Sequence, residues 1–175
     1  MNFSLVVAAD ENLGIGLNGD LPWRLKADLK YFKDLTSQTI DKTKINAVIM
    51  GRTTWESIPE KFRPLPNRLN IILSKTLSKN SIAGAEIASS IEQALKISEL
   101  KGVENCFVIG GGKVYQEAIQ SPLCSSIYIT EVKGTFNCDT FFPKFQPKFK
   151  LKTTTENQME NNIYFRFSEY ISYPI

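Results

Sequence analysis

The sequence predicts a single α/β domain in which a largely parallel central sheet ends in an antiparallel edge. Apolar, strand-like runs alternate with amphipathic helical patterns along most of the chain, which is the order found in parallel α/β sheets. The last two runs break this order, because no helix separates them and the second alternates polar and apolar residues. No linker divides the 175 residues into two parts.

Each expected element follows from its residue pattern. Five runs are rich in β-branched residues and apolar on both faces, as buried parallel strands are, and they cover residues 3–9, 45–50, 69–73, 106–110 and 127–132. Four helical patterns lie between them, at residues 24–35, in a short segment from Thr53, at 91–100 and at 114–119. Residues 149–155 and 163–171 predict the hairpin at the closing edge.

The composition excludes several kinds of active site. The chain contains no histidine, which removes Ser-His-Asp and Cys-His catalysis, His-ligated zinc and a His general base. The net charge of +3 is small and the basic residues are scattered, so we expect no nucleic-acid partner. Cys106, Cys124 and Cys138 are far apart and form no CxxC pair, which favours reduced thiols in a cytoplasmic protein. We expect no metal site. We also expect no membrane partner, since no apolar run approaches the ~20 residues of a membrane span.

A Gly-x-Gly-x-x-Gly motif follows the first strand, from Gly14 to Gly19. In a dinucleotide-binding Rossmann fold such glycines turn directly from a strand into a helix. Here residues 10–13 come before the motif, and an Asn-Gly turn and Pro22 follow, so a helix is not expected there. We therefore favour a Gly-jointed loop beside a site, of the kind that serves as a lid, over a Rossmann loop. A plain surface loop is less favoured, because its leucines and isoleucine would be costly to leave in water.

Three strand ends have residues that suit anions. Two of them place glycines before a helix, whose free N–H groups favour an anion, and the third places a hydroxyl beside a cation. Each junction alone is also consistent with a tight turn. Ligands of α/β sheets, however, bind at the carboxyl ends of the strands, so three such ends together predict a dinucleotide with an additional phosphate. The segments concerned are residues 51–54, 74–75 and 110–114.

Asp28 occupies an unfavourable position in the first predicted helix. Leu25, Leu29 and Phe32 form an apolar stripe at helical spacing, opposite a face of lysines, and Asp28 lies within that stripe. An unpaired buried carboxylate is costly and tends to take up a proton. Asp28 either lies at the rim of the stripe and pairs with Arg24 or another surface cation, or projects into an apolar pocket where it binds a polar heterocycle or handles a proton. With no histidine in the chain, Asp28 is the leading candidate for proton handling.

These residues resemble the dihydrofolate reductase family over nearly the whole chain. Seven stretches match in the family's order: residues 14–16 with 19–23, Asp28, residues 50–52 with 54–59, residues 63–65, Arg68, residues 110–112 with 114–115, and residues 138–143. The resemblance implies one reductase domain over residues 1–175, with an eight-stranded, mostly parallel sheet and about four helices. It also implies NADPH-dependent reduction of 7,8-dihydrofolate to 5,6,7,8-tetrahydrofolate, by hydride transfer to C6 and protonation at N5, in support of one-carbon metabolism and thymidylate synthesis.

The resemblance assigns the substrate site residue by residue. Asp28, oriented by a hydrogen bond to Thr130, would bind the amino-pyrimidine edge of the pterin and favour protonation at N5. Asp28, Thr130 and Leu21 take the catalytic positions. Arg68 would bind the α-carboxylate of the substrate's glutamate, although the pattern alone also fits a surface charge at a loop end. The residues expected to line the pterin and benzoyl pocket are Val6, Val7, Ala8, Leu21, Leu29, Phe32, Ile58, Leu65, Ile109 and Tyr115.

The cofactor residues follow in the same way. Ala8, Ile15 and the loop of residues 14–23, with Gly19 and Asp20, would border the nicotinamide. A cis peptide would join the first two glycines of the triple-glycine turn. Many members of the family have a second basic residue in place of Thr53 and an arginine in place of Lys75, so the size of the preference for NADPH over NADH is open. The residues expected to bind the phosphates and the rest of the cofactor are Gly51, Arg52, Thr53, Thr54, Leu73, Ser74, Lys75, Ile109, Gly110, Gly111, Gly112, Lys113, Val114 and Tyr115.

The resemblance also implies a substrate, a class of inhibitors and an oligomeric state, and two other functions are considered beside it. We expect dihydrofolate as substrate, inhibition by antifolates such as methotrexate, and a monomer unless the natural chain is fused to thymidylate synthase, as in some protists and plants. The nearest alternative enzyme is an NADPH-dependent reductase of riboflavin-pathway pyrimidines with the same fold, which does not need both Asp28 and Arg68. The alternative outside the enzymes is a non-catalytic NADP(H)- or folate-binding module, which would not oxidise NADPH.

Overall fold

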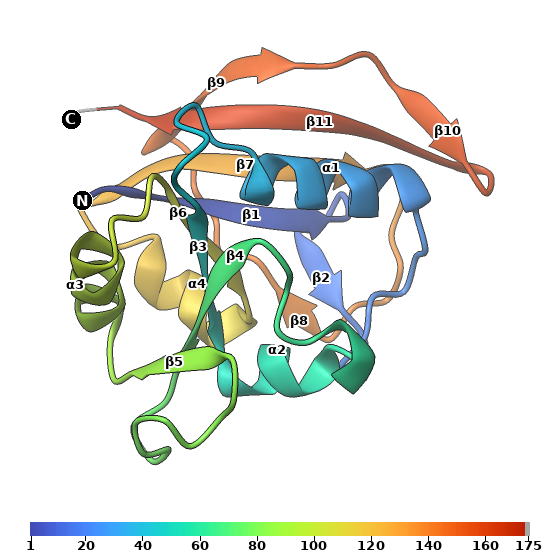
Figure 1. Cartoon of the computed structure of the whole chain (residues 1–175). Coiled ribbons are helices and arrows are strands. Elements are labelled where there is room, and N and C mark those ends of the chain that lie inside the picture. The colour runs from blue at the N-terminus through green and yellow to red at the C-terminus, as the bar shows by residue number, and fades with distance from the viewer. Residues whose placement is uncertain (174–175) are drawn as a thin grey trace.

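A hydrogen-bonded sheet of nine strands runs through the protein (Figure 1). The computed structural model describes residues 1–173, so the last two residues of the expected domain, 174 and 175, lie outside the described part. Eight strands follow one another in the order β10-β11-β7-β1-β6-β3-β4-β5, and β9 also pairs with β11. The strands are β1 (Phe3–Ala9), β3 (Asn46–Gly51), β4 (Arg68–Leu73), β5 (Ala85–Ala88), β6 (Cys106–Gly110), β7 (Cys124–Val132), β9 (Phe149–Thr154), β10 (Gln158–Glu160) and β11 (Ile163–Ser172).

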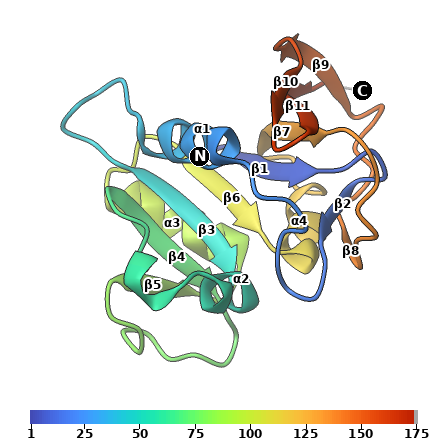
Figure 2. The ribbon, with the colours of Figure 1, turned by 90° about the vertical axis from the view of Figure 1, so that its right-hand side faces the viewer.

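The sheet is parallel in its centre and antiparallel at one end. The six neighbouring strands from β7 to β5 are parallel to one another, and β11 runs antiparallel to β7. β9 and β10 pair with successive stretches of β11 and therefore share one position across the sheet. Figure 2 shows β9, β10 and β11 together at the end of the sheet opposite β5. The predicted α/β class, the parallel centre and the antiparallel closing edge are confirmed.

Four α-helices cover the two faces of the sheet: α1 (Lys26–Ser37), α2 (Arg52–Ser57), α3 (Ile91–Leu100) and α4 (Gly112–Ala118). Trp55 of α2 packs with Val48 and Met50 of β3, whereas α3 and α4 pack in the cluster that contains Ile49. Because side chains of a strand alternate between faces, α2 and the pair α3 and α4 lie on opposite faces. Helix α1 lies on the face of α2, since its Ala27 packs in the cluster of Ala8. No helix within residues 1–173 is both long and apolar enough to cross a membrane.

Four short strands are not predicted from the sequence. β2 (Gly14–Gly16) and β8 (Thr140–Phe141) form a separate two-stranded sheet, so part of the glycine motif is a strand and not a loop. β5 and β10 lie at the ends of the main sheet, and their few apolar residues do not stand out from their surroundings. The other elements begin and end within three residues of their predicted bounds. Helix α1 begins at Lys26 and not at residue 24, because Leu25 still has an extended backbone.

The apolar stripe predicted for α1 is partly wrong. Leu25 is buried just before the helix, but Leu29 is 57% exposed. The half-buried or buried side of the helix consists instead of Asp28, Tyr31, Phe32, Leu35 and Thr36. The helix is therefore turned so that Asp28 faces the sheet while Leu29 lies toward solvent. The three lysines of the opposite face, at positions 26, 30 and 33, are exposed as predicted.

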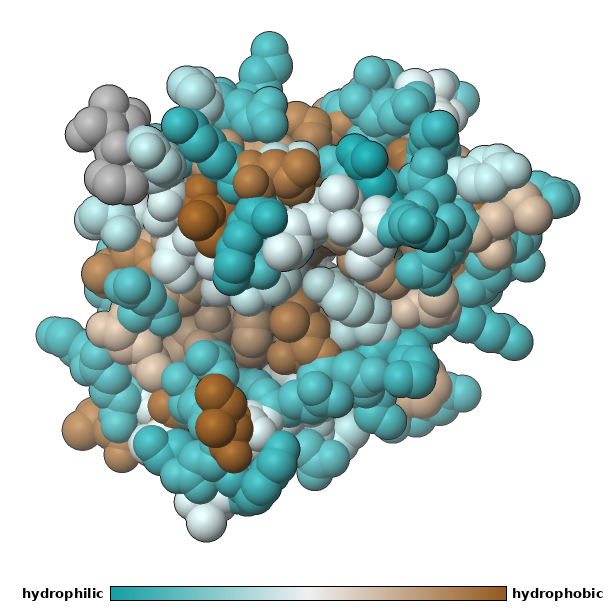
Figure 3. All heavy atoms as spheres, turned by 90° about the horizontal axis from the view of Figure 1, so that it is seen from above, coloured by the Kyte–Doolittle hydropathy of each residue, from teal (hydrophilic) through white to brown (hydrophobic). Residues whose placement is uncertain are grey.

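The closing edge of the sheet is polar. Residues 150–155 are exposed, and Lys152 of β9 pairs with Glu169 of β11 at 3.2 Å. Figure 3 looks onto this end of the molecule and shows hydrophilic residues over most of it, with hydrophobic residues between them. Charged residues of this kind protect an edge strand from pairing with another chain.

Asn46, at the start of β3, joins the end of helix α1 to the sheet. Its side chain is fully buried, and its Nδ2 donates to the carbonyl oxygens of Thr36 at 3.1 Å and Gln38 at 2.8 Å. Its Oδ1 accepts from the backbone N–H of Asn105 at 3.1 Å. The last turn of α1 therefore has a fixed place above β3.

Replacing Asn46 by alanine should lower the free energy of unfolding by about 2–4 kcal/mol, because buried backbone groups of three residues lose their partners. Urea denaturation followed by circular dichroism measures the change. Asn2→Ala, at an exposed asparagine, is the control and should change stability by less than about 0.5 kcal/mol. A loss as small as the control's would show that Asn46 does not hold α1.

Candidate active site

Helix α1 and strand β7 bring Asp28 and Thr130 together. Thr130 lies beside Ala8 in the register of β7 with β1, and its Oγ1 donates to Asp28 Oδ1 at 2.6 Å. Burial raises the pKa of the Asp28 carboxyl, the Thr130 hydrogen bond lowers it and the charge of Glu160 raises it, so that the pKa lies above the usual value. The partner of Asp28 is thus a buried threonine and not the exposed Arg24.

Arg68, the first residue of β4, is a buried cation. Its Nη1 donates to Thr36 Oγ1 and its Nε donates to the carbonyl of Pro66, each at 2.9 Å, and the guanidinium lies 5.9 Å from the ring centroid of Phe32. Only 9% of the residue is exposed, and none of the ion pairs found within residues 1–173 includes it. Burial lowers the pKa of this guanidinium. A buried guanidinium that lacks a carboxylate favours an anionic ligand, so Arg68 is not the surface charge that the sequence pattern also permits.

The two charged groups lie at opposite ends of one helix face. Asp28 and Thr36, the partner of Arg68, are eight residues apart on α1, which corresponds to about 12 Å along the helix axis. The half-buried ring of Phe32 lies between them. This arrangement suits an elongated ligand with a hydrogen-bonding heterocycle at one end, an apolar middle and a carboxylate at the other end.

Most of the other residues predicted to contact substrate belong to the core near this helix. Val6 and Val7 of β1 are buried, and the hydroxyl of the buried Tyr115 donates to the carbonyl of Val6 at 2.5 Å. The partly buried side chains of Ile58, Leu65 and Ile109 all pack against the cluster on the face that α1 and α2 cover. Ile58, Leu65 and Ile109 therefore lie on the face of α1 and α2, whereas Val7 and Tyr115 pack in the cluster of the other face, from which Tyr115 reaches the Val6 carbonyl.

Two residues predicted to contact substrate are exposed. Leu29 is 57% exposed and Leu21 is 42% exposed, so the expectation that the Leu21 side chain is shielded from water is wrong. Leu21 is fixed through its backbone, whose N–H donates to the Asp20 carboxylate at 2.8 Å. Exposed apolar side chains beside buried polar groups are typical of ligand-binding surfaces.

The carboxyl ends of β3 and β6 meet where side chains would not fit. Met50 pairs with Gly110, and the peptide bond between Gly110 and Gly111 is cis, as the resemblance implies. Gly110 has a φ of +130°, and a Cβ added to Gly110 or Gly111 would lie 3.4 or 3.2 Å from Thr54 Oγ1. Glycine at both positions keeps the backbone of β6 close to the start of α2.

Helices α2 and α4 both begin at this point without a side-chain cap. Their N-cap residues are Gly51 and Gly111, so the N–H groups of their first turns remain available. A Cβ added to Gly51 would lie 3.8 Å from the nitrogen of Gly111, which places the two helix starts next to each other. Paired helix N-termini and close backbone suit the phosphates of a nucleotide cofactor. Arg52, the first residue of α2, pairs with Glu56 at 2.8 Å.

The third predicted strand end lies beside these two. Leu73 pairs with Gly51 in the register of β4 with β3, so Ser74 and Lys75 follow immediately beyond the sheet. Ser74 Oγ accepts from the backbone N–H groups of Thr76 and Leu77 at 3.2 and 3.1 Å. Lys75 is exposed and takes part in none of the ion pairs within residues 1–173. The structure thus brings the three expected anion-binding ends together along one edge.

Of the other predicted cofactor residues, Thr53, Lys113, Gly19 and Asp20 are exposed, and Ile15, Gly112 and Val114 are half-buried.

The glycine motif does not form a Rossmann loop. After β2, Leu17 and Asp20 form an isolated bridge, and the next helix, α1, starts only at Lys26. The segment is tied to the region of β8, because the N–H of Asn18 donates to Asp139 Oδ2 at 3.0 Å. A loop with a fixed base therefore lies between β1 and α1.

Two functional groups were missed in the sequence. Thr36 is buried and orients Arg68, and it could have been found by extending the face of Asp28 and Phe32 by one turn. Trp23 is buried, and its Nε1–H has no acceptor within residues 1–173. A buried unpaired donor is rare in proteins, so this N–H is available to a ligand or a water molecule near Ala8, with which Trp23 clusters.

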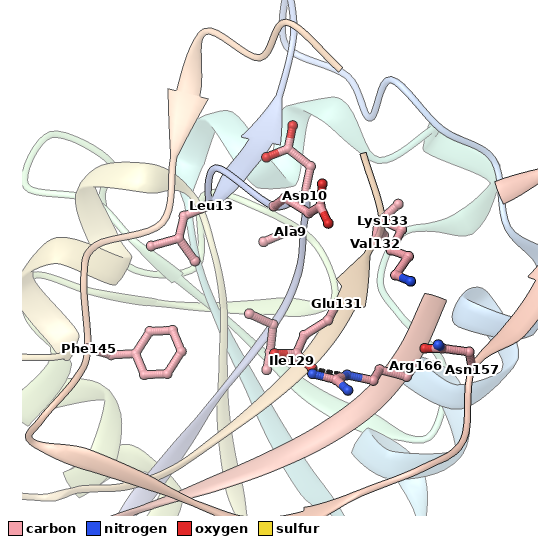
Figure 4. A pocket seen from close by; sticks show the side chains of 11 residues that line it. Ala9, Asp10, Leu13, Ile129, Glu131, Val132, Lys133, Phe145, Asn157 and Arg166 are labelled. Atoms are coloured by element: carbon pink, nitrogen blue, oxygen red, sulfur yellow. Dashed lines mark hydrogen bonds and ion pairs between the residues drawn. The ribbon is translucent and has the colours of Figure 1, made fainter. Parts of the chain in front are cut away.

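A cavity of about 470 Å³ lies on the other face of the sheet and is lined by none of the residues predicted to bind substrate or cofactor. Ile129 and Glu131 line it, and they flank Thr130 on β7, so they point away from Asp28. Figure 4 shows Arg166 directed toward Glu131, which it meets at 2.7 Å. Glu131 also accepts from Ser168 and Tyr170, so its charge is already satisfied. The face of Asp28 and Arg68 is therefore the better candidate for an active site.

Comparisons with known proteins show the family of the chain. The sequence model of the family described as dihydrofolate reductase matches residues 2–172. A dihydrofolate reductase of Drosophila melanogaster is 46% identical in an alignment of length 174 that covers 95% of this chain and 96% of that protein. One of Aedes albopictus is 43% identical, with 98% of each chain covered. A bifunctional dihydrofolate reductase-thymidylate synthase of Daucus carota is 43% identical over 97% of this chain and 33% of that protein.

Proposed function

The chain belongs to the dihydrofolate reductase family, and we propose that it reduces 7,8-dihydrofolate to 5,6,7,8-tetrahydrofolate with NADPH. One observation supports this substrate above all. The Asp28 carboxyl and Thr36, which holds the buried Arg68 without a carboxylate partner, lie about 12 Å apart along α1, with Phe32 between them. Dihydrofolate has a pterin, an aromatic middle and a glutamate in the same order.

Each end of the substrate meets a complementary group under this proposal. The Asp28 carboxylate accepts from the donors on the amino-pyrimidine edge of the pterin, while Thr130 holds one of its oxygens. Arg68 binds the α-carboxylate of the glutamate, and Thr36 fixes the guanidinium for this contact. Val6, Val7 and the other predicted apolar residues enclose the rings and exclude water.

The proton and the orientation are the protein's contribution to the chemistry. NADPH, when bound, supplies the hydride that reduces pterin C6. Asp28 grips the far edge of the ring and cannot reach N5, so it favours protonation there through its charge. The free Nε1–H of Trp23 is available to hold a water molecule that delivers the proton. Leu21 and the rest of loop 14–23 border the nicotinamide.

The edge formed by β3, β4 and β6 fits a nucleotide cofactor. Uncapped starts of α2 and α4 meet there, and glycines leave room for phosphate oxygens. Gly51 to Thr54 and Gly110 to Val114 would hold the diphosphate, whereas Arg52, Ser74 and Lys75 would hold the 2′-phosphate. Ala8, Ile15 and Tyr115 would lie near the nicotinamide.

We propose a cytoplasmic location for the protein, which its three free cysteines support. We also propose that residues 1–175 form one reductase domain that acts as a monomer unless it is joined to thymidylate synthase, that antifolates such as methotrexate inhibit it, and that its product serves one-carbon metabolism. The presence of both the Asp28 carboxyl and the buried Arg68 guanidinium disfavours the riboflavin-pathway alternative, which does not need both groups.

The direct test is the loss of absorbance at 340 nm with dihydrofolate and NADPH, with methotrexate as the control that should abolish it. Asp28→Asn should lower the rate at pH 7 by about 10² or more, because the group that favours N5 protonation is lost. The rate of the variant should rise as the pH falls, since the proton must then come from solution. An unchanged rate of Asp28→Asn at neutral pH would remove Asp28 from the mechanism, and absence of NADPH oxidation by the unaltered chain would leave a binding module.

Arg68→Leu should raise the Kd for dihydrofolate about 10- to 100-fold, because a charge-assisted contact to the glutamate is lost. Fluorescence titration measures the Kd. A pterin analogue that lacks the glutamate is the control, and its affinity for the two proteins should be equal. Equal weakening for both ligands would mean that Arg68 only supports the fold.

Cofactor preference tests the 2′-phosphate assignment. We expect kcat/KM with NADPH to exceed that with NADH by at least about tenfold, since each charge-assisted contact to the 2′-phosphate adds binding energy. Steady-state rates at fixed dihydrofolate give both values. Equal values would refute the assignment to Arg52, Ser74 and Lys75.

A further inference from the structure

Helix α1 receives its N-terminal cap from the other end of the chain. Leu25 at the N-cap position has no side-chain acceptor. Instead, the N–H of Lys26 donates to Glu160 Oε2 at 2.6 Å and the N–H of Ala27 donates to Glu160 Oε1 at 3.0 Å. The Glu160 carboxylate therefore binds the first two free N–H groups of the helix, as a capping side chain does.

The turn between β10 and β11 holds Glu160 in this position. Glu160 pairs with Ile163 across the turn, and its neighbours Asn161 and Asn162 have φ of +51° and +61°. Asn161 Nδ2 donates to the carbonyl of Arg24 at 2.9 Å, just before the helix. Figure 1 shows this turn beside the end of α1 at which the helix begins. Two consecutive residues of one turn thus grip the start of α1 at three points.

Asp28 is the third residue of the same helix. A carboxylate in the first turn can bond to the free N–H groups at the start of its own helix, where the helix dipole also stabilises it. Because Glu160 already occupies two of these groups, the Asp28 carboxyl is left to bond across to Thr130 on the sheet. The side chain that the substrate needs is free because another side chain has taken the capping role.

We propose that Glu160 is a positioning residue for the reductase reaction, which caps α1 in place of Asp28 and leaves the Asp28 carboxyl to the substrate. This inference rests on the proposed function for its kinetic consequences, but the capping itself concerns the protein alone. Glu160 is not a catalytic residue in this scheme, since it acts on the pterin only through Asp28.

Electrostatics add a second effect in the same direction. The two backbone N–H groups lower the pKa of Glu160, so it is ionised at neutral pH, and its charge raises the pKa of Asp28. The other titratable groups coupled to Asp28 are Tyr31 of α1, whose pKa is raised to about 12, and Tyr115 of α4, whose pKa is also raised mainly by burial. Both tyrosines are neutral at pH 7, which leaves Glu160 as the charged neighbour among the described residues.

Removal of the Glu160 charge should therefore lower the pKa of Asp28 for two reasons. The repulsion between the two carboxylates disappears, and the freed N–H groups of α1 become available to the Asp28 carboxylate. Glu160→Gln is the informative variant, because its amide oxygen still accepts one N–H and keeps the turn intact. Glu160→Ala removes both the cap and the charge, and Glu156→Gln, at an exposed glutamate of the same segment, is the matched control.

The first measurement needs no activity. Carbon-13 NMR of the protein labelled at the aspartate carboxyl carbons, with Asp28→Asn to assign the signal, follows the titration of Asp28 in each variant. We expect the Asp28 titration to shift to lower pH in Glu160→Gln and further in Glu160→Ala, with no shift in Glu156→Gln. An Asp28 titration that is the same in the unaltered protein and in Glu160→Gln would overturn the proposal.

The second measurement is the pH dependence of dihydrofolate reduction. In Glu160→Gln we expect the apparent pKa of the rate to fall, kcat above that pKa to fall about three- to fivefold, and KM for NADPH to stay unchanged. Thermal denaturation accompanies it, because a role limited to stability would lower Tm and leave the pH profile where it was, which also contradicts the proposal. If the unaltered chain proves to have no reductase activity, the proposed function fails, while the NMR titration still decides the role of Glu160.

Discussion

A single hydrogen bond between a helix and the sheet, from Thr130 to Asp28, fixes the carboxyl on which the candidate site depends. Helix α1 turns one carboxyl toward an otherwise apolar face of the sheet, and burial would push that group toward its neutral form. The threonine keeps the carboxylate form accessible and fixes its direction. Most of the other features of the site concern how α1 is held: Asn46 fastens its last turn, and the β10–β11 turn fastens its first.

The cofactor edge depends on a different constraint, which is the parallel order of the strands. β3, β4 and β6 end at the same side of the sheet, so segments far apart in the sequence meet there. The absence of a side chain at Gly51, Gly110 and Gly111 then lets two helix starts and a strand end approach one another. The phosphate binding proposed for this edge would need few charged side chains, because backbone N–H groups would supply most of the donors.

The sequence was sufficient for the elements with strong periodicity and for groups whose chemistry conflicts with their surroundings. The buried parallel strands and α3 were placed within a few residues, and Asp28 stood out as an acid in an apolar stripe. Short strands such as β2 and β8 were missed, because two or three residues contain no measurable pattern. The prediction that Leu29 belongs to the buried face of α1 is wrong. Periodicity shows that a helix has an apolar face, but it does not show how the helix is rotated against a particular sheet. The role of Glu160 comes from a contact between distant segments, which no local pattern encodes, whereas the helical pattern places Thr36 on the face of Phe32 but does not show its contact with Arg68.

The shared edge of β11 has a consequence for how the chain can change in length. Two residues of β11, Arg166 and Phe167, lie opposite three residues, 155–157, between the end of β9 and the start of β10. This surplus residue separates the register of β9, set by the buried Phe149, from that of β10, set by its turn. Insertions or deletions at 155–157 are thus absorbed where they arise, and homologues can differ there while each half of the edge keeps its own alignment.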